Sequence, residues 1–406
     1  GGRAADLLGR RRMFLVSLAV FVLASALGGL ADAGPLLIAT RLIKGISAAF
    51  TAPAGLSIIT TSFAEGPARN RALLVYTATG AIGFSLGLVF GGALTVLSWR
   101  WVFFLPVPVA LFVLVAASVL VPADPPRDGS SRAFDVAGAV ALTAAMLLLV
   151  FTVVEAPAAG WTSLRTVGSL ALAAAVLVGF IRHEARTVSP LIRLGILRSG
   201  PLVRANLAAM SLFGAYVGFQ FIATLYLQQL RGWSALETGM AIFPGGLVVA
   251  VLAPRVEPLV ERLGVKPLIL IGLGSTVASY ALFLRTGLAS SYVPAILPTM
   301  LLAGLGFALA YGPLNIAATN GIAADEQGLA SGLVTTSFQV GGALVLAAVT
   351  AVNSAWTVPR GSPAQILDGF HAAVVVSVVA AVLGVVAMAL PVLPRRSAIT
   401  VARPGG

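Results

Sequence analysis

The sequence predicts an all-α integral membrane protein, and three observations lead to that prediction. Of the 406 residues, 58% are hydrophobic and 10% are charged, whereas roughly 25% of the residues in soluble domains are charged. The mean hydropathy is +0.99. The apolar residues form runs of the length that crosses a bilayer as a helix, about 20 residues. Because these runs lack the alternation of barrel strands, each is expected to be helical.

Charged residues, Gly and Pro separate twelve such runs. The expected spans cover approximately residues 13–31, 36–61, 73–97, 101–121, 136–155, 165–182, 205–227, 236–254, 267–285, 293–316, 328–352 and 370–391. With a cytoplasmic N-terminus, 19 of the 26 Lys and Arg residues fall in inside loops and 5 in outside loops. The positive-inside rule therefore predicts a multi-pass protein of the cell membrane with both termini in the cytoplasm.

The composition also argues against several other classes of protein. The net charge of +12 calls for no nucleic acid partner, because anionic lipid headgroups account for it. The chain has no Cys, and its two His residues, His183 and His371, are far apart. Metal-protease and nucleotide-binding motifs are absent. We therefore expect no metal, no cofactor and no enzymatic activity.

A short charged loop precedes the first span. Its residues Gly2, Asp6, Gly9, Arg11 and Arg12 fit the pattern G-x-x-x-D-x-x-G-x-R-R. This pattern resembles the signature cytoplasmic loop of major facilitator superfamily transporters. In that family the loop joins the second and third helices, so the resemblance implies that two helices precede this chain.

Two roles are expected for this loop. Its arginines hold the N-terminus inside by reaching the lipid headgroups. The resemblance implies gating as well: Asp6, together with Gly9, Arg11 and Arg12, would close the cytoplasmic side. In that interpretation Asp6 lies against the positive N-terminal end of a helix that starts near Gly328.

Two internal similarities suggest a repeat. Residues 6–9 resemble residues 261–264, and the Gly-Gly-Ala-Leu sequence at 91–94 recurs at 341–344. The first similarity aligns span one with span nine, and the second aligns span three with span eleven. Spans one to four are then the last four helices of a six-helix half, spans five and six are an inserted pair, and spans seven to twelve form a complete half. The predicted divisions are residues 1–121, 122–204, 205–391 and a cytoplasmic tail at 392–406.

With two preceding helices, this 6 + 2 + 6 organisation resembles the 14-helix drug:proton antiporter branch of the superfamily. Two further motifs support the resemblance: Arg41-Leu-Ile-Lys44-Gly45 in span two and the glycine stripe Gly83, Gly87, Gly91 and Gly92 in span three. Three positions depart from the pattern of the branch. Lys44 stands where Gln is usual, Leu88 where Pro is usual and Pro106 where Asn is usual.

Charges inside the membrane point to function. Arg41 and Lys44 lie within span two, about 60° apart around the helix, so both can face the space between the halves. The resemblance implies proton coupling for the Arg, and the alternative is that Arg41 reaches the outer interface. The glycine stripe either seals and flexes the helix, as the resemblance implies, or serves ordinary helix packing.

The acidic residues all fall in loops or near the ends of spans, so the chain offers no clear proton carrier. Neutral polar side chains at mid-span could instead line a substrate path, although an interhelical hydrogen bond is the alternative for each. These side chains are Tyr216, Gln220, Asn315 and Gln339.

The predicted function is secondary transport: export of amphipathic small molecules in exchange for protons, by alternating access. The partners are the lipid bilayer, a small-molecule substrate and protons. The alternative is a fragment or sensor-like membrane protein of the same fold that does not transport.

Overall fold

The structure is a computed structural model that describes residues 9–63, 90–123, 135–187, 194–322, 327–356 and 361–390, with a few single positions between 68 and 87 and at Pro190. Every regular element in this part of the chain is helical, and eleven helices are long and apolar enough to cross a membrane. The predicted all-α membrane fold is confirmed. The described positions between 68 and 97 are also helical. They lie within, and just before, the predicted span 73–97.

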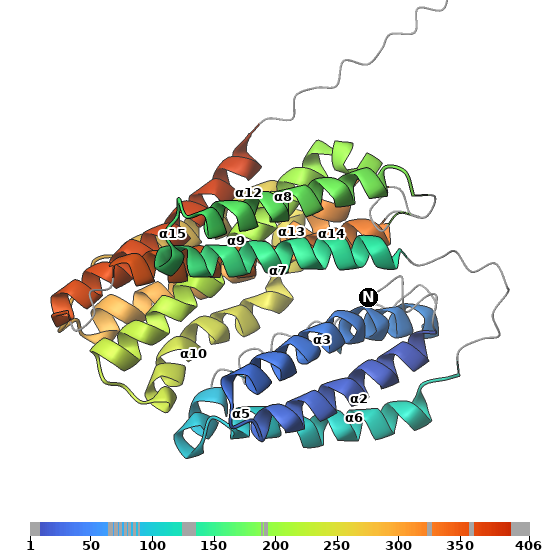
Figure 1. Cartoon of the computed structure of the whole chain (residues 1–406), viewed down its shortest axis with the longest axis horizontal. Coiled ribbons are helices and arrows are strands. Elements are labelled where there is room, and N and C mark those ends of the chain that lie inside the picture. Colours follow the sequence, from blue (N-terminus) through green and yellow to red (C-terminus); the bar gives the residue numbers. More distant parts are fainter. Residues whose placement is uncertain are drawn as a thin grey trace, which may run out of the picture.

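The first group of helices packs around α2 (Arg10–Gly29). This helix contacts α3 (Gly34–Ser62), α5 (Trp101–Phe104) and α6 (Pro106–Leu120), and the four lie together in Figure 1. The predicted span 101–121 is divided between α5 and α6. Proline has no N–H to continue the helical hydrogen bonds but fits the first turn of a new helix, so the break falls at Pro106.

Two helices follow as a hairpin. A side-chain cap begins each of them. The Asp135 carboxylate accepts a hydrogen bond from the Gly138 N–H at the start of α7 (Val136–Ala159). The Ser163 hydroxyl accepts one from the Thr166 N–H at the start of α8 (Leu164–Glu184). The helix α8 packs on α7, and α7 packs on α14 (Gln327–Trp356). The predicted position of this inserted pair outside both main bundles stays a prediction.

The last group centres on α9 (Gly200–Leu225), which packs against α13 (Leu297–Thr319), α14 and α15 (Pro363–Ala389). Its core holds fully buried aromatic side chains, among them Phe219, Tyr280 and Phe283. The other elements of this part of the chain are η1 (Leu194–Arg198), η2 (Tyr226–Leu230), α10 (Ala235–Leu252), η3 (Ala253–Arg255), α11 (Val256–Leu263), α12 (Val265–Phe283), η4 (Tyr292–Ile296), α13 (Leu297–Thr319) and α15 (Pro363–Ala389).

Two boundaries differ from the predicted ones. The last helix, α15, begins at Pro363 rather than near 370, because Ser362 and Gln365 form a capping box ahead of the apolar run. The chain after span eight, expected to leave the membrane near 254, stays helical to Leu263. It does so because Val256 in α11 is buried in a small apolar cluster with Leu268 and Leu309.

The repeated loop motif adopts the same backbone conformation twice. Gly9 precedes α2 with φ 94° and ψ 130°, and Gly264 precedes α12 with φ 84° and ψ 160°. A residue with a side chain is strained at such positive φ values. The sequence similarity between 6–9 and 261–264 therefore corresponds to a shared helix entry.

Candidate functional site

The opening loop is described only from Gly9 onward. Gly9 is buried, the Arg11 guanidinium donates to the backbone oxygen of Ser118 at the end of α6, and Arg12 is exposed. Asp6 lies outside the described residues, so its predicted contact near Gly328 stays a prediction. The Arg11 bond links the start of α2 to the end of α6.

The two cations of span two lie beside aromatic rings. The Lys44 ammonium donates to the Ser25 hydroxyl at 3.0 Å and lies 4.9 Å from the Phe21 ring and 5.0 Å from the Phe103 ring. The Ser25 hydroxyl in turn donates to the backbone oxygen of Phe103 at 2.8 Å. Arg41 is exposed, with its guanidinium 5.9 Å from the same Phe103 ring.

These contacts join Lys44 to α2 and α5 rather than to the second half. No acidic side chain among the described residues forms a salt bridge with Arg41 or Lys44. The Phe rings and the Ser25 hydroxyl supply the compensation, because an ammonium is attracted to the face of an aromatic ring. The predicted role of both cations in proton coupling stays a prediction.

The glycine stripe meets the second half at one position. A Cβ atom added to Gly92 would lie 2.6 Å from the carbonyl oxygen of Ala235, the first residue of α10. Gly83, Gly87 and Gly91 are helical, and a Cβ atom on any of them would meet no atom within 4 Å. Among the four predicted residues, Gly92 alone thus brings the backbone of the 68–97 segment into close contact with α10.

Aromatic rings gather on one face of the second half. Phe213 and Tyr216 of α9, Phe307 and Tyr311 of α13 and Phe338 of α14 form one connected cluster, which we call the aromatic face. Tyr311 stacks on Phe307 with centroids 5.0 Å apart, and its side chain is 41% exposed.

Two of the predicted path residues lie at the aromatic face. Of the predicted path residues, Tyr216 belongs to the aromatic face, and the Gln220 amide donates to its hydroxyl at 3.2 Å. The structure therefore brings Tyr216 and Gln220, which lie one turn apart on α9, together beside the rings of α13 and α14.

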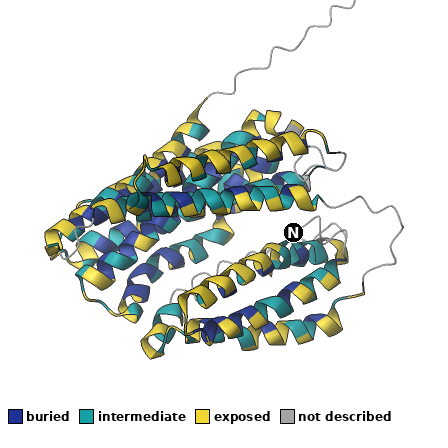
Figure 2. Cartoon of the chain, in the orientation of Figure 1, coloured by how far each residue is buried: buried dark blue, intermediate teal, exposed yellow. Residues whose placement is uncertain are grey.

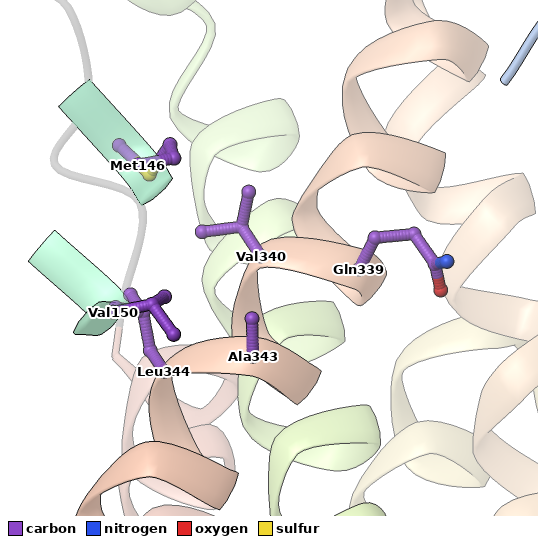
Figure 3. A pocket seen from close by; sticks show the side chains of 6 residues that line it. All are labelled: Met146, Val150, Gln339, Val340, Ala343 and Leu344. Carbon is purple, nitrogen blue, oxygen red and sulfur yellow. The ribbon is translucent and has the colours of Figure 1, made fainter. Parts of the chain in front are cut away.

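The other two predicted path residues lie elsewhere. Asn315 donates to the Tyr311 backbone oxygen of its own helix at 2.8 Å. Gln339 is exposed and lines an apolar cavity of about 180 Å³ between α7 and α14, together with Met146 and Val150. Figure 3 shows the Gln339 amide directed away from these two side chains of α7.

Sequence reasoning missed two polar contacts. The Ser337 hydroxyl of α14 donates to the Asn206 side chain of α9 at 2.7 Å. At the other contact, His183 lies 3.0 Å from Asp135 and joins the ends of α7 and α8. Each pair is far apart in sequence, and only the cap signal of an Asp before an apolar run could have drawn attention to Asp135.

Eleven membrane-length helices in the described part of the chain, with a close backbone approach between the first and last groups at Gly92 and Ala235, are the architecture of a multi-pass membrane transporter. The sequence profile of the Major Facilitator Superfamily matches residues 1–346. The chain belongs to that family.

Curated relatives are exporters and resistance proteins by name. The Cephamycin export protein CmcT of Amycolatopsis lactamdurans is 36% identical over 398 residues, which are 97% of this chain and 81% of that protein. The Puromycin resistance protein pur8 of Streptomyces alboniger is 35% identical, over 91% of this chain and 75% of its own length. The Tetracenomycin C resistance and export protein of Streptomyces glaucescens is 32% identical over 84% of this chain and 63% of that protein.

Solved structures share the fold. The human organic anion transporter MFSD10 superposes with a TM-score of 0.62 at 20% identity, covering 95% of this chain and 79% of that structure. A peptide transporter superposes with a TM-score of 0.63 at 17% identity, covering 96% of this chain and 81% of that structure. At such identities the likeness concerns the fold alone.

Proposed function

We propose that this protein exports amphipathic small molecules from the cell in exchange for protons, by alternating access. The observation that carries the proposal is the contact between Gly92 and Ala235, where the two halves touch backbone to backbone. Alternating access requires the halves to rock against each other around a central site. A contact without interlocking side chains favours such motion.

The direction of transport rests on the relatives, whose names state export of or resistance to cephamycin, puromycin and tetracenomycin C. The proposed substrate path follows the aromatic face and the Gln220 amide. Apolar and aromatic walls with a few polar groups are typical of sites for small organic molecules.

The proposal includes membership of the 14-helix drug:proton antiporter branch, with both termini in the cytoplasm. Gly9 and Gly264, which precede α2 and α12 with similar positive φ angles, support this membership. They align α2 with α12, as the 6 + 2 + 6 organisation requires. In this alignment α2, α3, the 68–97 segment and α5 with α6 are the last four helices of the first half. Arg41 and Lys44 would serve proton coupling, and Asp6 would serve the cytoplasmic gate.

Transport into inside-out vesicles tests the proposal. Vesicles that carry the protein should accumulate puromycin or tetracenomycin C when their interior is made acidic, and nigericin should abolish the accumulation because it dissipates the proton gradient. Vesicles with the Gly92→Val variant should accumulate little. Accumulation that survives nigericin would contradict proton coupling, and equal uptake by vesicles without the protein would contradict export.

A further inference from the structure

Two cationic side chains of α3 lie within the membrane span. Arg41 and Lys44 are about 10 Å and about 15 Å along the helix from its first residue, Gly34, at 1.5 Å per residue. From this geometry we propose that the two side chains together bind the anionic group, a carboxylate or a phosphate, of an amphipathic molecule. The proposal rests on the proposed function in one respect, because it adds acidic compounds to the substrates of that transport.

The acidic residue nearest to this pair in the sequence is bound elsewhere. Asp32 precedes α3, and its carboxylate forms a salt bridge of 2.6 Å with the Arg100 guanidinium. Neither Arg41 nor Lys44 forms a salt bridge with a residue that the structure describes. Two positive charges at this depth are costly without a counter-charge. A bound anion would therefore stabilise both.

The Lys44 ammonium is held in place and still has donors available. It donates to the Ser25 hydroxyl at 3.0 Å, and that hydroxyl donates its own proton to the backbone oxygen of Phe103 at 2.8 Å. An ammonium has three N–H donors, and Lys44 donates no second hydrogen bond to a described residue. Two N–H groups are therefore available to an anion.

A single aromatic ring lies beside both charges. The Arg41 guanidinium carbon lies 5.9 Å, and the Lys44 nitrogen 5.0 Å, from the centre of the Phe103 ring. The Arg41 guanidinium donates no hydrogen bond to a described residue, and a guanidinium can present two parallel N–H groups to a carboxylate or phosphate. Because the two side chains reach the same ring from adjacent turns of one helix, a single anion can contact both.

The surface of α3 leaves room for a ligand beside the pair. Arg41 is exposed and Lys44 is partly buried. A Cβ atom added to Gly45, one turn after Arg41, would meet no atom within 4 Å. Ile38, one turn before Arg41, is 70% exposed. The open space can take the anionic group, while Ile38 offers an apolar contact to the rest of an amphipathic molecule.

The position of the pair suits an exported acid. In Figure 1, α3 lies between α2 and the helices of the last group. The charge distribution predicts that the end of α3 nearer to the pair faces outside, so an exported acid would meet both cations close to its exit. The pair is a particular feature of this chain, because Lys44 stands where the branch that the sequence resembles usually has the uncharged Gln.

Binding of 4-tert-butylbenzoate to the whole protein in non-ionic micelles tests the inference, with the uncharged 4-tert-butylbenzamide as its isostere. We expect saturable binding of the acid alone. Lys44→Gln and Arg41→Gln should each raise the Kd about tenfold through the loss of one charge. Lys44→Arg keeps the charge and should bind nearly as wild type does. The control Lys266→Gln, which removes a cation at the start of α12, should leave the Kd unchanged.

A further variant tests the site without altering its charge. Gly45→Leu fills the open space beside the pair and should raise the Kd about fivefold through a steric clash with the ligand. Unfolding temperatures of all variants verify the fold. Wild-type affinity in both Gln variants or in Gly45→Leu, or equal binding of the amide, would overturn the inference.

A lipid headgroup can supply the same anionic chemistry as a soluble acid. Competition by dihexanoyl-phosphatidylglycerol, but not by dihexanoyl-phosphatidylcholine, would support the site and assign it to an anionic lipid. Competition by neither would assign it to a soluble acid. Because this assay involves no transport, its failure is separable from failure of the export assay.

Discussion

The first group of helices buries much less of its surface than the last group does. Within the most apolar stretch of each helix, 11% of the residues of α3 are buried, against 56% for α9. Figure 2 shows the same contrast, with buried residues concentrated in the second half. The second half is thus stabilised by its own core, whereas α2 to α6 depend more on lipid or on other helices for covering their apolar side chains.

The two groups also differ in how their helices meet. In the second half, glycines allow backbones to touch: a Cβ atom on Gly341 would collide with the Met210 backbone, and one on Gly304 with the Gly245 backbone. In the first half, the polar Lys44–Ser25–Phe103 contact joins α2, α3 and α5. Four substitutions, ordered by expected effect, test this contrast.

The largest effect is expected for Gly341→Val. The added side chain would push α14 away from α9, and overpacking of this kind costs about 1–3 kcal/mol or more of the free energy of unfolding. Thermal unfolding in micelles measures the loss. Gly332→Val on the same helix is the control, because a Cβ atom there meets nothing within 4 Å. Similar unfolding temperatures for both variants would show that the glycine contact is unimportant.

Gly92→Val is expected to affect transport more than stability. The side chain would separate the 68–97 segment from the first turn of α10, where a Cβ atom has no room. Efflux should fall about tenfold or more, while the unfolding temperature changes little because each half keeps its own packing. Gly87→Val, at an open position of the same stripe, should transport normally. Equal loss in both variants would indicate a general effect on the helix.

Ser25→Ala should weaken the first half alone. It removes the hydroxyl between Lys44 and the Phe103 backbone oxygen, and a buried polar group left without its partner costs about 1–3 kcal/mol. Hydrogen exchange should rise in α2 and α5 and stay unchanged in α9. Ser118→Ala, which removes an exposed hydroxyl on α6, is the control. Faster exchange throughout the protein would contradict the independence of the two halves.

The smallest effect is expected for Asp135→Asn in the hairpin. Desolvation raises the pKa of the Asp135 carboxyl, but hydrogen bonds from the Gly138 N–H and the His183 side chain, the His183 charge and a contact with Glu184 outweigh it and lower the pKa. A lowered pKa stabilises the folded state above the unfolded pKa of about 3.9. That contribution is lost as the pH falls through the folded pKa.

The variant should therefore be less stable than wild type at pH 7 by up to about 1 kcal/mol, since the contact between Asp135 and His183 is partly exposed. The difference should shrink below about pH 4 as the wild-type carboxyl becomes protonated. Asn still caps the helix, so the loss of charge is isolated. The measurement is the unfolding temperature of wild type and variant, at pH 7 and below about pH 4. If the difference between the two proteins does not vary with pH, the role of the charge is contradicted.

The sequence predicted the helices better than it predicted the site. The length of an apolar run locates a membrane span, because the thickness of the bilayer sets that length. The arginines before Met13 and the glycine of each repeated loop mark where α2 and α12 begin. Contacts between distant residues leave no such signal. The pairing of Asn206 with Ser337 and the position of Lys44 between two Phe rings depend on helix rotation, which one sequence does not encode in its pattern. The mid-span position of Gln339 predicts its depth in the membrane, but depth alone does not predict its place beside α7.

The backbone contact between Gly92 and Ala235 has a mechanical consequence. It lies at one end of α10, whose 18 residues span about 27 Å at 1.5 Å per residue. If this contact served as a fulcrum, a rotation of about 10° would move the far end of α10 by about 5 Å. A displacement that is negligible at one mouth is thus wide enough at the other to admit an organic molecule.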